Sequence, residues 1–292
     1  MAVARQNLFG DRSIQVERAM RNLFDFHLHT GHYYEWSAKA RQLWMETGPY
    51  WREIYTARGE QDVDAFARVL ADEGVVGGVL LPEYAPHTAG VMPVERALAI
   101  AGRYPQFIPF GALNPELHSD PVAEFERQLG LGVRGLKIHG VHCRHRVNDP
   151  RLYPVYEICR DRELPLMLHA GTSVFPGVRL RHADPYDFDD LAVDFPTLKL
   201  VLCHGGRGFW YQLAEFMIMR HERVYIDLSG LPPRNLLRYY PKLARFYPKF
   251  VFGTDFPGVP GVRANAEAIA ALGLTEKMLE HIFTRNAAAL LA

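Results

Sequence analysis

The sequence predicts one α/β domain over residues 1–292 that folds as a closed (β/α)8 barrel, also called a TIM barrel. Short runs rich in Val, Ile, Leu and Phe alternate with longer amphipathic segments, as strands alternate with helices in this architecture. No linker or short repeat divides the sequence, and barrels of this length commonly form one domain. The alternation is broken by an aromatic-rich insertion after the first predicted strand.

The predicted strands are short apolar runs, as expected for parallel strands that are buried on both faces. They lie at 24–29, 76–82, 107–113, 133–139, 165–170, 199–204, 224–229 and 250–255. The segments between them have helical periodicity; in the first, Val63, Phe66 and Leu70 recur at helical spacing. The predicted helices lie at 61–73, 94–103, 121–130, 152–163, 186–194, 209–221, 234–246 and, in two pieces, 262–291. An open doubly wound sheet is the alternative, but it usually carries a glycine-rich first turn, and none follows His29.

The insertion at residues 30–60 lies, in a barrel, on the rim formed by the carboxyl ends of the strands. Its large aromatic residues are Tyr33, Tyr34, Trp36, Trp44, Tyr50, Trp51 and Tyr55. Two interpretations are open. The aromatics form a lid or pocket wall that can reach a neighbouring subunit, or they pack on the barrel as a small helical excursion.

The composition is that of a globular protein, with 48% hydrophobic and 23% charged residues. Lys+Arg and Asp+Glu both number 33, so the formal charge of +0 gives no electrostatic case for nucleic acid or an anionic membrane as partner. No apolar run approaches the roughly 20 residues that cross a bilayer, and Met1–Gln6 lacks the apolar core of a secretory signal. The cysteines, odd in number, suggest no disulfide framework. We therefore expect a cytoplasmic protein.

Polar residues interrupt the apolar runs at the carboxyl ends of the predicted strands. His27 and His29 alternate along the first strand, so both leave it on the same face. The others are Lys137, His139, His169, His204, Asp227 and Asp255. A single strand-end histidine is ordinarily a core residue with a hydrogen-bond partner. A barrel, however, brings all strand ends to one axis, so these groups become neighbours.

Four of these residues form a ligand set that suits one zinc ion per chain, with Mn²⁺, Fe²⁺ or Co²⁺ as alternatives. The four are His27, His29, His169 and Asp255. Such an ion lowers the pKa of a bound water from ~16 to about 7. His204 then lies where it can hydrogen-bond the water or polarise a substrate oxygen. Asp255 can both bind the ion and accept the water proton.

Several short motifs together resemble the amidohydrolase superfamily. They are HxH at 27–29, GxKxH at 135–139, CHGG at 203–206, GTDFP at 253–257 and IxxxNAxxLL at 282–291. They are most similar to the amidohydrolase-related branch, which includes aminocarboxymuconate-semialdehyde decarboxylase and pyrone-dicarboxylate lactonase. The resemblance covers residues 23–291. It implies a mononuclear metal on the four ligands above, His204 as a catalytic group beside it, and a homodimer. Polymerase-and-histidinol-phosphatase barrels also open with HxH, but CHGG and GTDFP match the amidohydrolase branch better.

Further residues are expected to contact the substrate. They are Lys137, His139, Arg144, Arg207 and Trp44. The arginines belong to a cationic rim that suits a substrate carboxylate, although solvated loops carry such residues too. Lys137 occupies the strand that, in binuclear superfamily members, offers a carbamylated lysine. A structural pair with Asp25 or Asp227 is the alternative for this lysine.

The ligand set indicates a metal-dependent hydrolase that acts on a small carboxylated lactone, ester or amide. A lyase, a nonoxidative decarboxylase of an aromatic or unsaturated acid, can use the same ligands and stays open as the alternative. A purely structural zinc site is disfavoured, because such sites are usually closed by four Cys or His ligands. The expected partner is a small-molecule substrate.

Overall fold

The structure, a computed structural model, describes residues 20 and 22–292. The strands are β1 (Leu23–His29), β2 (Val75–Leu81), β3 (Glu83–Ala85), β4 (Gly90–Met92), β5 (Phe107–Pro109), β6 (Gly111–Leu113), β7 (Leu136–Ile138), β8 (Leu166–Gly171), β9 (Leu200–Arg207), β10 (Val224–Asp227) and β11 (Phe250–Val251). The α-helices are α2 (Ala38–Thr47), α3 (Val63–Asp72), α4 (Val94–Arg103), α5 (Pro121–Gly130), α6 (Gly140–Cys143), α7 (Tyr153–Asp161), α8 (Pro185–Asp194), α9 (Tyr211–Arg220), α10 (Leu236–Tyr239), α11 (Leu243–Phe246), α12 (Val262–Ala270), α13 (Glu276–Glu280) and α14 (Asn286–Leu291). Single turns of 3₁₀ helix are η1 (Tyr33–Glu35), η2 (Tyr50–Arg52), η3 (Pro150–Leu152), η4 (Leu180–Ala183), η5 (Pro233–Asn235) and η6 (Tyr247–Lys249), and η7 (His281–Arg285) is a π-helix.

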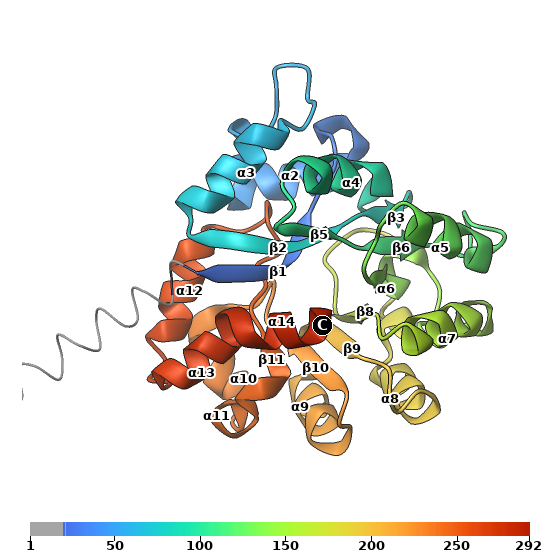
Figure 1. Cartoon of the computed structure of the whole chain (residues 1–292), viewed down its shortest axis with the longest axis vertical. Coiled ribbons are helices and arrows are strands. Elements are labelled where there is room, and N and C mark those ends of the chain that lie inside the picture. The colour runs from blue at the N-terminus through green and yellow to red at the C-terminus, as the bar shows by residue number, and fades with distance from the viewer. Residues whose placement is uncertain (1–19, 21) are drawn as a thin grey trace, which may run out of the picture.

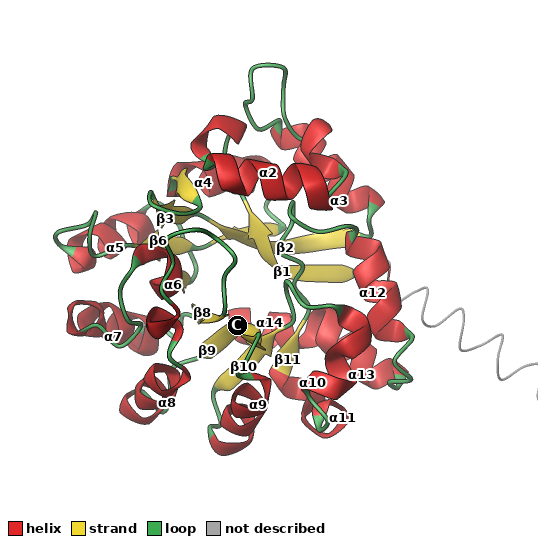
Figure 2. Cartoon of the chain, turned by 180° about the vertical axis from the view of Figure 1, so that it is seen from behind, coloured by secondary structure: helices red, strands yellow, loops and turns green. Residues whose placement is uncertain are grey.

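The strands form a closed parallel barrel inside a ring of helices (Figures 1 and 2). Parallel pairing runs β1–β2–β5 in one sheet and β6–β7–β8–β9–β10–β11 in the other. The two sheets join at Phe110, whose N–H donates to Leu80 O over 3.0 Å. They join again where Phe26 N–H donates to Phe252 O over 2.9 Å, next to a parallel bridge between Leu28 and Phe256. The (β/α)8 prediction is therefore confirmed.

Most predicted elements lie where the periodicity placed them, with the following differences. The predicted strand 250–255 is a strand only over Phe250–Val251 of β11. The predicted strand 107–113 is divided at Phe110 into β5 and β6. The predicted helix 234–246 is divided into the short helices α10 and α11. The antiparallel hairpin of β3 and β4 was not predicted, since it lies in a segment whose prolines and glycine are typical of loops.

The inside of the barrel is apolar at its amino-terminal end. Phe26, Phe110 and Met167 meet there in one buried cluster with Ala287 and Leu290 of α14. Figure 1 shows α14 across the centre of the ring. The helix therefore closes this mouth of the barrel and leaves only the carboxyl ends of the strands to form a cavity.

Some of the surrounding helices, α3 and α5 among them, begin at a residue whose side chain caps the first turn. The Asp62 side chain accepts hydrogen bonds from Asp64 N and Ala65 N at the start of α3, and Asp120 accepts one from Ala123 N at α5. In the described part of the chain, no helix combines the length and the apolar character that a membrane span requires. The opening segment Met1–Gln6, which the sequence analysis considered as a signal, lies outside the described residues.

Candidate active site

A cavity of about 390 Å³ opens at the carboxyl ends of the strands. Its polar wall comes from strand ends and the loops after them: His29, Glu83, His139, His169, His204 and Asp255. Its apolar wall includes Trp36 and Trp44 from the insertion, whose ring centroids lie 3.8 Å apart, and Phe175 from the segment after β8. Part of the aromatic insertion thus forms a pocket wall. Tyr50 instead packs against Phe256, with 5.0 Å between ring centroids, so both interpretations of the insertion hold for different residues.

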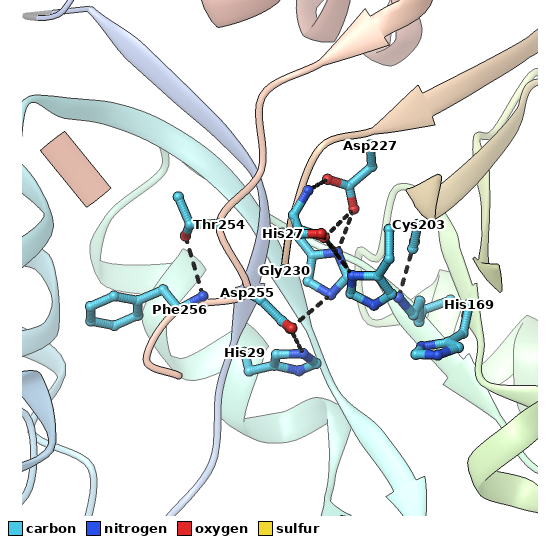
Figure 3. Close-up of polar contacts among 12 residues, drawn as sticks. His27, His29, His169, Cys203, Asp227, Gly230, Thr254, Asp255 and Phe256 are labelled. Carbon is cyan, nitrogen blue, oxygen red and sulfur yellow. Dashed lines mark hydrogen bonds and ion pairs between the residues drawn. The ribbon is translucent and has the colours of Figure 1, made fainter. Parts of the chain in front are cut away.

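The first and last barrel strands bring three of the predicted ligands together (Figure 3). His29 Nε2 lies 2.9 Å from Asp255 Oδ1, and His27 Nε2 lies 3.4 Å from the same oxygen. Asp255 reaches this position because the segment after β11 runs beside β1, where Asp255 N–H donates to His27 O over 3.0 Å. The pairing of distant strands expected from a closed barrel is what makes these groups neighbours.

His27 is held in the form that leaves a lone pair for a metal. Its Nδ1 lies 2.5 Å from Asp227 Oδ2, and that carboxylate also accepts a bond from Ser229 Oγ over 2.9 Å. Because a carboxylate accepts, His27 Nδ1 carries the proton and Nε2 presents its lone pair. Nε2 is buried and has no hydrogen-bond partner. An unpartnered buried nitrogen beside Asp255 fits a cation at this place.

His204 adds a further nitrogen to the same group. Ligand atoms of His27, His204 and Asp255 all lie within 4.8 Å of one another. His204 Nδ1 lies 3.0 Å from the backbone carbonyl of Ser229, so Nδ1 carries the proton and Nε2 the lone pair. The sequence predicted that His204 acts beside the metal; the structure brings it as close to His27 and Asp255 as a ligand would be.

His169 stands on the other side of His204. Their ring centroids are 4.6 Å apart. His169 Nδ1 lies 2.7 Å from His139 Nε2, and His169 Nε2 is buried without a partner. Three of the four predicted ligands, His27, His29 and His169, thus each have one unpartnered ring nitrogen while the other nitrogen is hydrogen-bonded.

A buried polar layer lies under these groups. Lys137, only 1% exposed, donates from Nζ to Cys203 Sγ over 3.0 Å and is not among the residues that line the cavity. Its partner is therefore Cys203, not the aspartates that the sequence suggested as structural alternatives. Asp25 accepts bonds from Thr254 N over 3.0 Å and from Thr254 Oγ1 over 2.5 Å, which fixes the segment before Asp255.

Burial favours the neutral form of three histidines of the site, His27, His169 and His204. It lowers the pKa of His27, and it lowers the pKa values of His169 and His204 well below their ordinary range. Burial, the largest single effect, would raise the pKa of Asp255, but the hydrogen bond with His29 and the electrostatic effect of His204, His27 and His29 together outweigh it and hold this pKa well below its usual value. Burial raises the pKa of Glu83 above its ordinary value. Neutral imidazoles beside an ionised carboxylate are the protonation states that bind a divalent ion.

The residues expected to contact substrate fall in different places. Arg207 lines the cavity, with its Nη2 donating to Thr172 O over 3.1 Å and its Nη1 4.0 Å from Asp255 Oδ2. Trp44 and His139 also line it. Arg144 is exposed, and its guanidinium lies beside Gly177, outside the group of lining residues.

Glu83 and Ser229 were not predicted from the sequence. Glu83 directly follows Pro82 after β2, so it is an acid near a strand end, as Asp255 is. Ser229 lies two residues after Asp227, which was noted, and donates to it. Both residues are polar and lie near the end of a strand, but neither interrupts an apolar run as the predicted site residues do.

A closed barrel that gathers neutral histidines and a carboxylate around a cavity at its strand ends is the arrangement of a metal-binding barrel enzyme. The chain belongs to the amidohydrolase family, whose sequence profile matches residues 24–292. Enzymes of this family generally use a divalent metal, and the described residues contain clusters with the spacing of metal ligands.

The sequence identity to individual proteins is low. One curated relative, 2-keto-4-carboxy-3-hexenedioate hydratase of Sphingobium sp., is 32% identical over 111 residues, which are 32% of this chain and 33% of the relative. The match thus spans about a third of that protein. An uncharacterised barrel protein of Bordetella bronchiseptica is 22% identical, with a TM-score of 0.76 over 92% of this chain and 98% of that one. The 2,6-dihydroxybenzoate decarboxylase of Rhizobium is 17% identical, with a TM-score of 0.64 over 92% and 98%. Both of these structures share the fold of this chain.

Proposed function

We propose that the protein is a metal-dependent hydrolase that adds water to the carbonyl carbon of a small carboxylated lactone, ester or amide. The observation that supports this most directly is the pair of buried, unpartnered ring nitrogens of His27 and His169 together with the Asp255 carboxylate. These groups have the chemistry of zinc ligands and belong to a cavity with room for a small substrate.

The ion would be held by His27, His29, His169 and Asp255, with zinc as the first choice and manganese, iron or cobalt as alternatives. When bound, it supplies Lewis acidity and lowers the pKa of a coordinated water. His204 is the residue that can replace one of these ligands, since its nitrogen lies within 4.8 Å of the ligand atoms of His27 and Asp255.

Two side chains are placed to move the proton. Asp255 Oδ1 is engaged by His29, whereas Oδ2 lies toward Arg207, so one carboxylate can bind with one oxygen and accept a proton with the other. His204 Nε2 carries a lone pair because Nδ1 donates to Ser229 O. It can therefore take the proton, and once protonated it can donate to the oxygen that becomes negative at the carbonyl.

Arg207 supplies the charge that selects a carboxylated substrate. Its side chain is 27% exposed and is anchored by Thr172 O, so the guanidinium is oriented but still reachable from the cavity. Arginine binds carboxylates through paired, charge-assisted hydrogen bonds. Trp36, Trp44 and Phe175 would cover the apolar part of the same molecule.

A lyase is the second candidate. The aromatic wall of Trp36, Trp44 and Phe175 is well suited to stack an aromatic or unsaturated acid, which favours nonoxidative decarboxylation. The similarity to a hydratase over a third of its length makes addition of water to a carbon–carbon double bond the other lyase reaction to test.

An assay of metal-loaded protein against three substrate panels tests the proposal. The panels are carboxylated lactones, esters and amides; unsaturated keto acids; and hydroxybenzoates. Ring opening or release of a free acid without carbon dioxide supports the hydrolase. Release of carbon dioxide from a hydroxybenzoate, or hydration of a double bond with no activity on the first panel, would replace it with the lyase.

The variants Asp255→Asn and His204→Ala test which of the two residues is needed to bind the metal and which is needed to accept the proton. Asp255→Asn should fold normally and lose at least ~100-fold in kcat, because an amide cannot accept the proton. His204→Ala should keep stoichiometric metal and lose rate. Metal content by elemental analysis and kcat by steady-state assay provide the check. Loss of metal from His204→Ala would make this histidine a ligand, and near-normal kcat in Asp255→Asn would remove the role given to Asp255.

A further inference from the structure

Three buried side chains from separate elements form a continuous hydrogen-bonded chain. Glu83 on β3 lies at 2.7 Å, Oε2 to Nδ1, from His139, which follows β7. His139 Nε2 in turn lies 2.7 Å from Nδ1 of His169 on β8. Glu83 and His169 are each 2% exposed and His139 is 9% exposed, so water does not replace either bond.

The direction of the bonds follows from what each atom can do. Both carboxylate oxygens of Glu83 face His139 Nδ1, Oε1 at 2.6 Å and Oε2 at 2.7 Å, which is the geometry of one N–H shared by two acceptors, so His139 Nδ1 carries the proton and donates to Glu83. His139 Nε2 then has a lone pair and accepts from His169 Nδ1–H. This leaves the lone pair of His169 on Nε2, the nitrogen that is buried and unpartnered. Each link of the chain thus sets the tautomer of the next.

We propose that Glu83 and His139 are positioning residues, which fix the tautomer and ring orientation of His169 so that Nε2 faces the metal. This inference rests on the proposed function, because it takes His169 as a ligand. It assigns His139 a role through His169, in place of the substrate contact that the sequence indicated. Metal-binding histidines that donate their other N–H to an acceptor are usually oriented in this manner.

The arrangement parallels that of His27 on the opposite side of the site. There a carboxylate, Asp227, contacts the histidine directly at 2.5 Å. His169 has the imidazole of His139 at the equivalent ring nitrogen, and the carboxylate is one residue further away. The antiparallel hairpin of β3 and β4 holds that carboxylate, since Glu83 pairs with Met92 through the backbone. The hairpin therefore positions the carboxylate that ends the hydrogen-bonded chain.

A second metal ion is the competing explanation for this cluster. Ligand atoms of His139, His142 and His169 lie within 4.8 Å of one another. Both ring nitrogens of His139 are already hydrogen-bonded, Nδ1 to Glu83 and Nε2 to His169 Nδ1 at 2.7 Å, so an ion bound by His139 would have to break one of these bonds. His142 Nδ1 is also engaged, by Thr88 Oγ1 at 3.1 Å. The hydrogen-bonded chain accounts for these nitrogens without an ion.

The test is the affinity for Zn²⁺ itself, measured by competition with a chromophoric chelator on the full chain. Glu83→Ala and His139→Ala should each weaken zinc binding about 10–100-fold. Glu83→Gln, which can still accept from His139 Nδ1–H, should recover part of the loss. The double variant should be no weaker than His139→Ala alone, because Glu83 acts only through His139. The d–d absorption of the Co²⁺-loaded protein should change in the same variants.

Glu215→Ala is the matched control for removal of a buried carboxylate. Glu215 on α9 is 7% exposed and accepts from Lys242 N over 2.7 Å, away from the cavity. It should alter stability but not zinc affinity. The proposal is overturned if His139→Ala raises KM while zinc affinity stays unchanged, or if losses in the double variant are additive. It is also overturned if the protein binds two ions and His142→Ala removes one.

His169→Ala separates this inference from the proposed function. If that variant binds zinc as the unaltered protein does, His169 is not a ligand and the proposed metal centre fails. If it loses zinc while Glu83→Ala and His139→Ala keep it, the metal centre stands and only the positioning role falls.

Discussion

Two residues at the centre of the site have a left-handed backbone. His204 has φ of 63° and Asp255 has φ of 76°. Such a conformation costs a non-glycine residue roughly 1–2 kcal/mol, so it persists only where the surroundings impose it. Gly205 and Gly206 continue the left-handed backbone within β9 after His204, and a Cβ at Gly206 would lie 2.4 Å from Trp210 O. The CHGG motif therefore describes a local irregularity of β9 at which His204 faces the site.

Gly230 is another residue whose lack of a side chain shapes the cavity. Its φ is +62°, and a Cβ there would lie 2.4 Å from Arg207 Nη1 and 3.1 Å from His204 Nδ1. Gly230→Ala should displace the guanidinium and lower kcat/KM for a carboxylated substrate about 10–100-fold, the value of a hydrogen bond to a charged group. Gly273→Ala, at φ +83° with open space around it, provides the control for backbone strain alone. Equal losses of kcat/KM in both variants would contradict the role of Arg207.

At this scale the sequence predicts the polar residues that interrupt or end the longer apolar runs and misses those that lie outside such runs. His27 and His29 follow from strand parity, because side-chain direction alternates along a strand. His204 and Asp255 follow from their place at strand ends in a barrel. Glu83 does not follow, since it lies after a proline and its partner His139 is 56 residues further along the chain. The partner of Lys137, Cys203, could not be predicted either, because no sequence pattern indicates that a lysine amine pairs with a cysteine thiol.

The last helical segment explains the motif at the end of the sequence. The π-helix η7 passes into α14 at Asn286, whose Nδ2 donates to Tyr247 O and Phe250 O, each over 2.7 Å. The next residue, Ala287, and Leu290 pack into the amino-terminal mouth of the barrel. The IxxxNAxxLL pattern is therefore structural: its asparagine fastens the helix to β11, and its apolar residues close the core.

Asn286→Ala tests this fastening. The substitution leaves two buried carbonyls without their donor and should lower the free energy of unfolding by about 2 kcal/mol. Asn148→Ala, which removes an exposed 3.2 Å bond to Asp190, should change it by less than about 0.5 kcal/mol. Urea denaturation followed by circular dichroism measures both. A difference within error between the two variants would show that Asn286 does not hold the helix.

Periodicity predicted the longer elements well because a buried face imposes a regular spacing on a helix. The prediction for 94–103 coincides with α4, and that for 121–130 coincides with α5. The hairpin of β3 and β4 escaped because three-residue strands carry almost no period. The segment 250–255 pairs as a strand only over Phe250–Val251, since the residues after it turn to place Asp255.

The barrel is closed by α14 at its amino-terminal mouth and open at the carboxyl ends of its strands. A ligand that binds at the open end can therefore stabilise the whole fold. The first and last strands of the barrel meet where His27 and Asp255 lie. An ion bound by both residues would therefore link the two ends of the sheet that the fold must bring together. Anything that binds the folded chain and not the unfolded one stabilises it.

Removal of metal should thus lower the melting temperature as well as stop turnover. At a free metal concentration about 100 times Kd the stabilisation is about 2.7 kcal/mol, which corresponds to a shift of about 4–5 °C for a domain of this size. Scanning calorimetry of chelator-treated and reloaded protein measures the shift. His27→Ala, which lacks a ligand, should melt at the same temperature with and without metal. An unchanged melting temperature in the unaltered protein would count against an ion that joins β1 to the segment after β11.

The tryptophans of the cavity wall have a practical consequence. Of the 4 tryptophans in the chain, Trp36 and Trp44 stand together on the cavity, and the Trp36 ring lies 5.7 Å from that of His29. Their emission depends on the polarity and charge next to the indole, so the arrival of a cation or of a small acid should change it. The protein thereby carries its own optical reporter, with which occupancy can be followed before any turnover is known.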